Sequence, residues 1–161
     1  MNFFTKILSA IALLTLNTKL ATQSCFAQAP SWQWAKGAGQ TGEDLGNSIV
    51  TDASGNVYAT GSYTSAGITF GNITLANAGS ADILLVKYDA AGNTLWAKSI
   101  GSAGGDVGYG IAVDGSGNVY VSGWFSSNTL TFESVPVINH GNGSTDIFLA
   151  KYDPSGTILW A

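Results

Sequence analysis

The sequence predicts an all-β protein made of four-stranded antiparallel sheets, and two observations carry this prediction. The chain has 161 residues, of which 21 are glycine and only 10% are charged, a composition that suits short strands joined by tight turns. The stretch DASGNVYATG (Asp52–Gly61) returns 62 residues later as DGSGNVYVSG (Asp114–Gly123). Such self-similarity at a fixed period indicates a repeat architecture in which each copy is one structural unit.

The same period extends over most of the chain. The segment WAK at 34–36 returns at 96–98, and DILLVKYDAAGNTLWA at 82–97 returns as DIFLAKYDPSGTILWA at 146–161. The second interval is 64 residues, so two additional residues lie before position 146. Insertions are tolerated in loops, and we therefore expect a longer loop there in the second unit.

Each unit is predicted to contain four strands. The expected strands are rich in β-branched and aromatic residues, and tight turns with aspartate, asparagine and glycine separate the first from the second and the third from the fourth. Two short alternating runs, ITF at 68–70 and ITL at 73–75, predict a small additional hairpin between the second and third strands. In the first unit the four strands are expected at 46–52, 56–63, 82–89 and 93–98.

The third strand of each unit indicates how the sheets pack. ILLVKY at 83–88 and IFLAKY at 147–152 are almost continuous apolar runs, which are typical of strands covered on both faces. A four-stranded sheet covered on both faces by copies of itself is a blade of a β-propeller. Solenoid stacking also covers both faces, but this unit is longer than solenoid coils usually are. We therefore predict propeller blades in an incomplete ring.

Both units resemble the SBBP repeat of bacterial β-propellers. The pattern consists of WAK, then D-x-G-x-x-I, D-x-x-G-N-V-Y, D-I-x-x-x-K-Y-D and a closing tryptophan, and it extends from Trp34 to Ala161. The resemblance implies a propeller in an exported or surface protein, without a particular activity. The repeat positions that we expect to be structural are Trp34, Gly55, Tyr58, Trp96, Gly117, Tyr120 and Trp160.

Residues 1–27 are predicted to be a secretory signal peptide. A basic start precedes the uncharged apolar run at 7–16, and small side chains at Cys25 and Ala27 favour cleavage after Ala27. Lipidation of Cys25 is the alternative. Cleavage leaves four lysines against ten acidic residues, a net charge of −6, which argues against nucleic acid or an anionic membrane as partner. We expect a secreted or cell-surface protein with no membrane span after cleavage.

The remaining chain is predicted to begin with a linker at 28–45 that contains an isolated closing strand, Trp32–Lys36. The first blade is expected at 46–98 and the second at 108–161. Two blades do not close a ring, since propellers use about four or more. The sequence therefore predicts either a piece of a longer propeller protein or a chain that needs other copies to close the ring.

Oxygen-bearing residues beside a glycine in two turns are weak candidates for a metal site. A calcium loop of the EF-hand type needs more carboxylates and a closing glutamate, which these turns lack. We therefore expect the side chains to hold the turns, and we predict no metal and no cofactor. The candidate ligands are Asp52, Asn56, Asp114 and Asn118.

The closing tryptophan of each unit resembles the tryptophan-docking motif of quinoprotein-like propellers. The spacing from aspartate to tryptophan is one residue shorter than in that motif. The resemblance implies that each tryptophan packs on the next blade, and it implies no quinone. The residues concerned are Asp89, Gly92 and Trp96, repeated as Asp153, Gly156 and Trp160.

Catalytic motifs are missing from the sequence, which has no nucleophile elbow, phosphate-binding loop or zinc-protease motif. His140 with Ser144 and Asp146 has the composition of an acid–base triad. These residues lie around the predicted insertion, and Asp146 has a counterpart in the first unit, Asp82. We therefore expect a structural role for Asp146 and no enzyme activity in this chain.

Trp124 and Phe125 replace Ser62 and Tyr63 of the first unit. We expect them to pack against a neighbouring blade, and contact with a protein or a glycan is the alternative.

The sequence therefore predicts an exported, non-enzymatic propeller scaffold that binds an unknown protein or glycan through the loops at 66–81 and 128–145. The alternative is part of a secreted propeller enzyme, for example one that degrades polysaccharides, with its active residues in other blades or domains.

Overall fold

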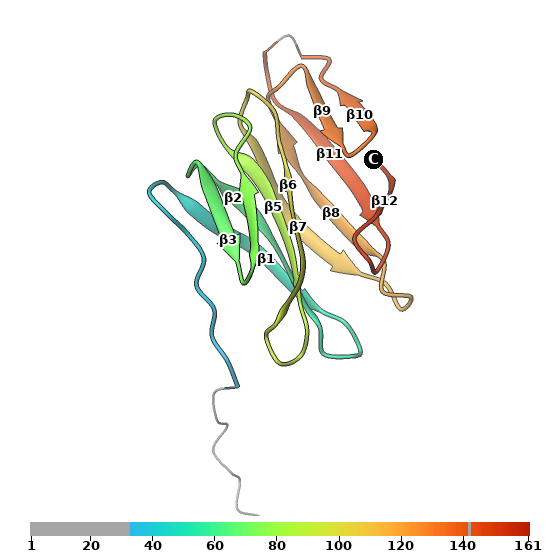
Figure 1. The fold of residues 1–161 in the computed structure, drawn as a ribbon. Coiled ribbons are helices and arrows are strands. Elements are labelled where there is room, and N and C mark those ends of the chain that lie inside the picture. Colours follow the sequence, from blue (N-terminus) through green and yellow to red (C-terminus); the bar gives the residue numbers. More distant parts are fainter. Residues whose placement is uncertain (1–32, 142) are drawn as a thin grey trace, which may run out of the picture. The chain divides into compact units, whose positions relative to one another are not determined.

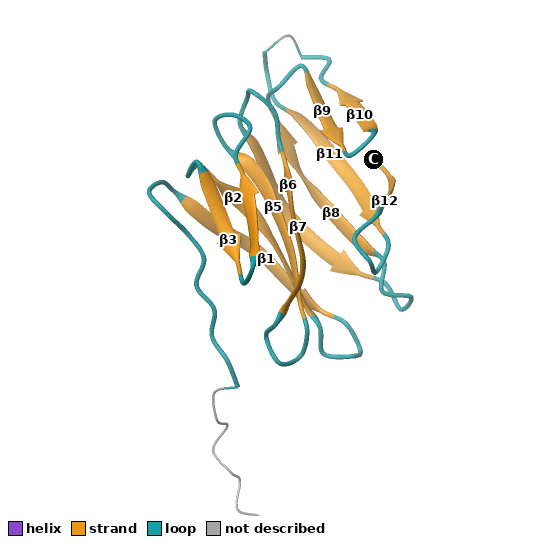
Figure 2. Cartoon of the chain, in the orientation of Figure 1, coloured by secondary structure: helices purple, strands orange, loops and turns teal. Residues whose placement is uncertain are grey.

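The computed structural model describes residues 33–141 and 143–161, and the predicted signal peptide lies outside these ranges. Within them the chain forms twelve strands and no helix (Figures 1 and 2). The described ranges accordingly contain no helix with the length and apolar character needed to cross a membrane. The all-β prediction is confirmed.

The first blade is a four-stranded antiparallel sheet with the strand order β1-β2-β5-β6. An antiparallel hairpin, β3 with β4, lies between β2 and β5 in the sequence and forms a separate two-stranded sheet. The bounds are β1 (Asp44–Thr51), β2 (Val57–Tyr63), β3 (Gly67–Phe70), β4 (Ile73–Ala76), β5 (Asp82–Tyr88) and β6 (Thr94–Ile100).

The second blade repeats this topology, with the strand order β7-β8-β11-β12 and its own hairpin of β9 and β10. The repeat extends to irregularities, because β1 and β7 both carry a bulge at the same place, after Gly46 and Gly108. The bounds are β7 (Asp106–Val113), β8 (Val119–Phe125), β9 (Thr129–Phe132), β10 (Val135–Ile138), β11 (Asp146–Tyr152) and β12 (Ile158–Trp160). The predicted blades of four antiparallel strands are confirmed, and the described strands form no closed ring.

Residues 33–36 form no strand, so the prediction of a closing strand at Trp32–Lys36 is wrong over its described residues. No strand of the described chain pairs with this segment, and a strand needs a partner for its backbone N–H and C=O groups. The first strands of the blades begin at Asp44 and Asp106, two residues earlier than predicted. Pairing with β2 and β8 continues on the far side of each bulge.

Strand β5 is buried at every residue because both of its faces are covered. One face, with Ile83 and Leu85, packs on the second blade and shares a core with Val121 and Phe148. The other face packs on the β3–β4 hairpin in a second core. Figure 1 shows the two sheets side by side, and β7 packs against β1, β2 and β5. The almost continuous apolar run at 83–88 is therefore explained by the burial of both faces of β5, as the sequence predicted.

Candidate functional site

Four turns of one design close the strand pairs at the same edge of the two sheets. In each turn the first residue is aspartate, whose carboxylate accepts hydrogen bonds from the backbone N–H groups two and four residues later. The fourth residue is a glycine with φ between 79° and 86°, a conformation that glycine adopts without steric cost. The turns are 52–56, 89–93, 114–118 and 153–157.

The metal candidates of the sequence lie in the first and third of these turns. Asp52 Oδ1 accepts from the N–H groups of Ser54 and Asn56, and its Oδ2 accepts from the Asn56 side-chain amide at 2.8 Å and the Tyr58 hydroxyl at 3.0 Å. Asp114 and Asn118 repeat this arrangement. Within the described ranges no three acidic, histidine or cysteine side chains are grouped as metal ligands. These contacts favour a turn-forming role.

The electrostatics of the third turn follow from the same contacts. The Asn118 side-chain amide lowers the pKa of Asp114 to about 2, and backbone N–H groups of the turn contribute in the same direction. Hydrogen bonds that donate to a carboxylate stabilise its charged form. Lys151 lies 3.8 Å from Asp114 Oδ2. Asp114 is therefore an anion at neutral pH whose oxygens are already engaged.

A hollow of about 460 Å³ lies between the first and third turns, where the two blades meet. Each blade contributes one turn to its wall, and the last turn contributes a proline. Polar groups make up much of the lining, including the hydroxyl-bearing residues Ser54 and Ser116. The principal lining residues are Asp52, Ser54, Tyr58, Lys87, Asp114 and Pro154.

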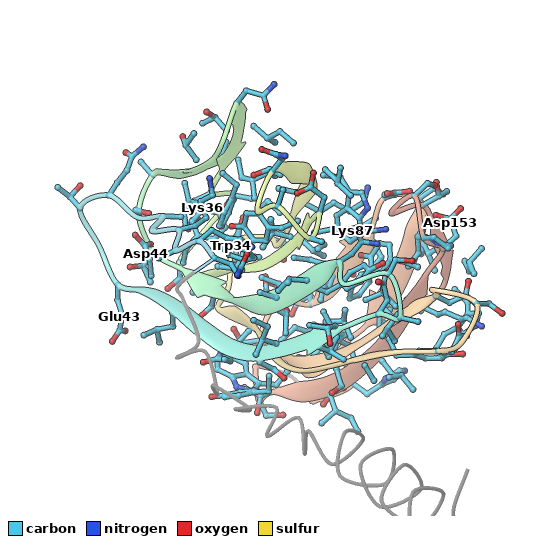
Figure 3. The ribbon with its side chains drawn as sticks, turned by 90° about the horizontal axis from the view of Figure 1, so that it is seen from below. Trp34, Lys36, Glu43, Asp44, Lys87 and Asp153 are labelled. Atoms are coloured by element: carbon cyan, nitrogen blue, oxygen red, sulfur yellow. The ribbon has the colours of Figure 1, made fainter. Side chains whose placement is uncertain are left out.

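Lys87 forms one wall of this hollow and joins the blades. Its side chain is 7% exposed, and its ammonium group donates a hydrogen bond of 3.0 Å to the carbonyl oxygen of Pro154 in the second blade. The ammonium also lies 4.9 Å from the centre of the Tyr58 ring, a favourable cation–π distance. Figure 3 shows Lys87 beside the turn that begins at Asp153.

Tyr58 continues this network into the first turn. Burial, together with the hydrogen bond to Asp52, raises the pKa of Tyr58 to about 12. The phenol therefore remains protonated at neutral pH and donates to the carboxylate. The charged and titratable groups of the hollow are thus engaged with one another, which suits binding through hydrogen bonds better than proton transfer or nucleophilic attack.

The repeat tryptophans dock on the turns of the following blade. Trp96 of β6 donates from Nε1 to the carbonyl oxygen of Pro154 at 3.3 Å, and its ring lies beside Gly156. Trp34 makes the same contact one blade earlier, since its Nε1 donates to the Ala90 carbonyl at 3.1 Å and its ring packs on Tyr88. Trp34, labelled in Figure 3, therefore lies on the first blade, and Trp96 lies in the same way on the second.

The docked indole ring of Trp34 fits because the turn has a glycine, Gly92, beneath it. A Cβ atom at Gly92 would lie 2.8–3.2 Å from ring atoms of Trp34, closer than carbon atoms approach one another without overlap. Gly92 and Gly156 therefore each serve two purposes, since each adopts a positive φ and leaves space for an indole ring.

Trp124 and Phe125, the contact candidates of the sequence, differ in exposure. Phe125, the last residue of β8, is fully buried in a core to which both blades contribute. The alternative that it contacts a ligand is therefore wrong, and Tyr63 is buried in the same way in the first blade. Trp124 is half-buried and pairs with Ile147 across β8 and β11. Its contact role stays a prediction.

The three residues with the composition of a triad do not form one. The His140 side chain is 85% exposed, and its Nδ1 atom lies 4.0 Å from Asp146 Oδ2. Asp146 Oδ2 instead accepts a hydrogen bond from the His140 backbone N–H, just as Asp82 accepts from Ala78. The described hydrogen bonds of Ser144 use its backbone, since its N–H donates to the Gly141 carbonyl and its own carbonyl accepts from the Asn139 side chain.

Sequence reasoning did not single out Lys87, Pro154, Asp82 or Asp106. A lysine inside an apolar run in both units was a usable signal, because a buried ammonium needs an acceptor. Asp82 and Asp106 are buried where the blades meet, and each has one carboxylate oxygen without a hydrogen-bond partner. Burial and the nearby Asp82 carboxylate raise the pKa of Asp106.

The chain is similar in sequence to known proteins. Residues 95–128 match the SBBP beta-propeller repeat. An uncharacterized WD repeat-containing protein of Acanthamoeba polyphaga mimivirus is 32% identical over 126 residues, which cover 70% of this chain. The regulatory protein FlaEY of Caulobacter vibrioides is 35% identical over 83 residues, 51% of this chain. The chain spans 9% of the length of each of these relatives.

The paired four-stranded sheets, the repeated strand order and the docking of Trp96 on the second blade define the chain as a β-propeller-repeat scaffold. The repeat that it carries is the SBBP beta-propeller repeat. The resemblance to the SBBP repeat that the sequence predicted is confirmed.

Proposed function

We propose that the chain is an exported, non-enzymatic scaffold at the cell surface or in the extracellular space, and that it binds a glycan in the hollow between the turns at 52–56 and 114–118. The proposal rests on which polar groups of the hollow are already hydrogen-bonded within the protein and which are not. The carboxylates, the phenol and the ammonium are engaged within the protein, while the serine-bearing turns present hydrogen-bonding groups to the opening.

Three further observations support binding rather than catalysis. The strands are occupied with packing, and the hairpins β3–β4 and β9–β10 direct their large apolar side chains inward, such as Phe70 and Phe132. Apart from Ile138, which is 51% exposed, the exposed residues of these hairpins are small or polar, including a Thr69–Thr74 hydroxyl pair. Neither relative carries the name of an enzyme, and one is named a regulatory protein.

The binding proposal is tested by affinity electrophoresis through gels that contain a neutral glucan, a mannan or a xylan. We expect at least one polysaccharide to retard the chain. Ser54→Trp is expected to fill the hollow and to remove the retardation, because Ser54 lines the hollow. The turn should tolerate this substitution, because Ser54 contributes only its backbone N–H to the described turn hydrogen bonds. Ala91→Trp is the matched control, since Ala91 has the same position in a turn outside the hollow. Equal migration in all gels contradicts glycan binding and leaves a protein as the partner to seek.

Export is tested separately. The gene is expressed in a bacterial host with its leader, and the product is recovered from cell fractions. We expect mature protein outside the cytoplasm with Gln28 as its first residue. Unprocessed protein confined to the cytoplasm contradicts the proposal.

A further inference from the structure

The two blades allow one face of the repeat to be compared in two environments. In the first blade the side chains of Ile83 and Leu85 point toward the second blade and are 0% exposed. Their counterparts in the second blade, Ile147 and Leu149, are 87% and 51% exposed. The same strand position is therefore fully covered in one copy and open to solvent in the other. We call this open surface the outer face of the second blade; it comprises Tyr120, Ser122, Ile147, Leu149, Lys151 and Trp160.

The first blade has an open surface of the opposite kind. In the second blade, Gly108 and Ile111 point toward the first blade, and a Cβ atom at Gly108 would clash with the Thr60 hydroxyl and lie 3.1 Å from a methyl group of Ile83. At the equivalent Gly46, a Cβ atom would meet nothing within 4 Å, and Ile49 is 69% exposed. We call the surface around Gly46, Ile49 and Thr51 the outer face of the first blade.

We propose that two copies of this chain associate head to tail, the outer face of the second blade in one copy binding the outer face of the first blade in the other. The occupant follows from the chain itself, because the covered version of each face packs against a blade of this same repeat. Ile147 and Leu149 would then meet Gly46 and Ile49, as Ile83 and Leu85 meet Gly108 and Ile111. Such a contact is heterologous, since the two copies contribute different surfaces.

The polar groups of the internal interface have counterparts on the outer faces. Lys87 and Trp96 both donate to the Pro154 carbonyl, and Lys151 and Trp160 hold the same positions on the second blade. The acceptor equivalent to Pro154 is the carbonyl of Ala90, which Trp34 occupies within its own chain. Association therefore requires Trp160 of one copy to replace Trp34 of the other, and Trp34 weakens the association by competing for that carbonyl.

The test is sedimentation velocity of the full chain over a range of concentrations. We expect concentration-dependent self-association of the unmodified chain. Ile147→Lys and Ile49→Lys each place a charge in one of the two faces, and each weakens the association at least about tenfold, which corresponds to about 1.4 kcal/mol. Thr131→Lys is the control, because Thr131 is exposed on the β9–β10 hairpin outside both faces.

The decisive measurement mixes the two single variants. Ile147→Lys retains an intact first-blade face and Ile49→Lys an intact second-blade face, so the two variants should form a one-to-one complex more tightly than either associates with itself. Trp34→Ala is expected to strengthen the self-association of the otherwise unmodified chain. A chain that remains monomeric both unmodified and as Trp34→Ala, or a mixture without heterodimer, overturns the proposal.

Discussion

The ammonium nitrogen of Lys87 lies 3.0 Å from the carbonyl oxygen of Pro154, and this hydrogen bond joins strand β5 of the first blade to the last turn of the second. Lys151 has the same repeat position in the second blade, and both lysines lie 4.9 Å from the centre of a tyrosine ring. Lys151, however, lies 3.8 Å from Asp114 Oδ2 of its own blade. The contact with a second blade therefore distinguishes Lys87 from Lys151 in this structure.

Lys87→Met is expected to destabilise the fold, whereas Lys151→Met is expected to be nearly neutral. The first substitution keeps most of the side-chain volume but removes the charged donor of the hydrogen bond to Pro154, and hydrogen bonds of charged groups contribute about 1.5–3 kcal/mol. The second removes a partly exposed ion pair, which contributes about 1 kcal/mol or less. Urea unfolding at neutral pH measures both. Equal losses would show that Lys87 does not stabilise the contact between the blades.

Trp96→Ala is expected to lower the free energy of unfolding by about 3 kcal/mol, since it removes an indole packed between the blades. Trp160→Ala is the matched control, because Trp160 has the same repeat position but is 43% exposed. A loss below about 1 kcal/mol is expected there. Both are measured by denaturant unfolding at a concentration where the chain is monomeric. If the two variants lose the same stability, docking on the next blade is not what Trp96 contributes.

The sequence predicted the repeated elements well because their causes are local. The turn at 52–56 is held by contacts within five residues, and the apolar run at 83–88 shows that β5 is covered on both faces. The predicted strand at Trp32–Lys36 is wrong because a strand depends on a partner that the sequence does not show. The sequence left ligand contact open for Phe125 for a related reason, since substitution within a repeat does not reveal which side of the sheet a residue faces.

The candidate site could be predicted only in part. Asp52 and Asp114 were identified, but the hollow between them exists because two turns 62 residues apart are brought together. The role of Lys87 depends on a carbonyl group 67 positions away, and backbone carbonyls carry no sequence signal.

Asp114→Asn is expected to lower stability at neutral pH and to have less effect in acid. The folded-state pKa of Asp114 is about 2, below its ordinary value of 3.8. A depressed pKa contributes stability that is present above the unfolded-state value and is lost as pH falls through the folded-state value. The difference in urea midpoint between the variant and the unmodified chain should therefore shrink between pH 4 and pH 2. A constant difference over this range contradicts the assignment.

Asp106→Asn is expected to act in the opposite direction. Burial raises the pKa of Asp106, and the nearby Asp82 carboxylate adds to the increase. A carboxyl group whose folded-state pKa lies above 3.8 opposes folding at neutral pH, and this opposition is relieved as pH falls toward that value. The variant should therefore have the higher urea midpoint at pH 7, with the advantage declining toward pH 4. A lower midpoint at pH 7 would show that the ionised carboxylate stabilises the contact between the blades.

Gly108→Ala and Gly46→Ala provide the sharpest comparison, because the two glycines follow the same strand start and precede the same bulge. A methyl group at position 108 would clash with the Thr60 hydroxyl inside the packed interface, and overpacking of this kind costs about 1–3 kcal/mol. A methyl group at position 46 meets open space and should change stability by less than about 0.5 kcal/mol. Thermal and urea unfolding, at a concentration where the chain is monomeric, should give the same ranking. If Gly108→Ala is as well tolerated as Gly46→Ala, the two blades do not pack as closely as the Thr60–Gly108 contact requires.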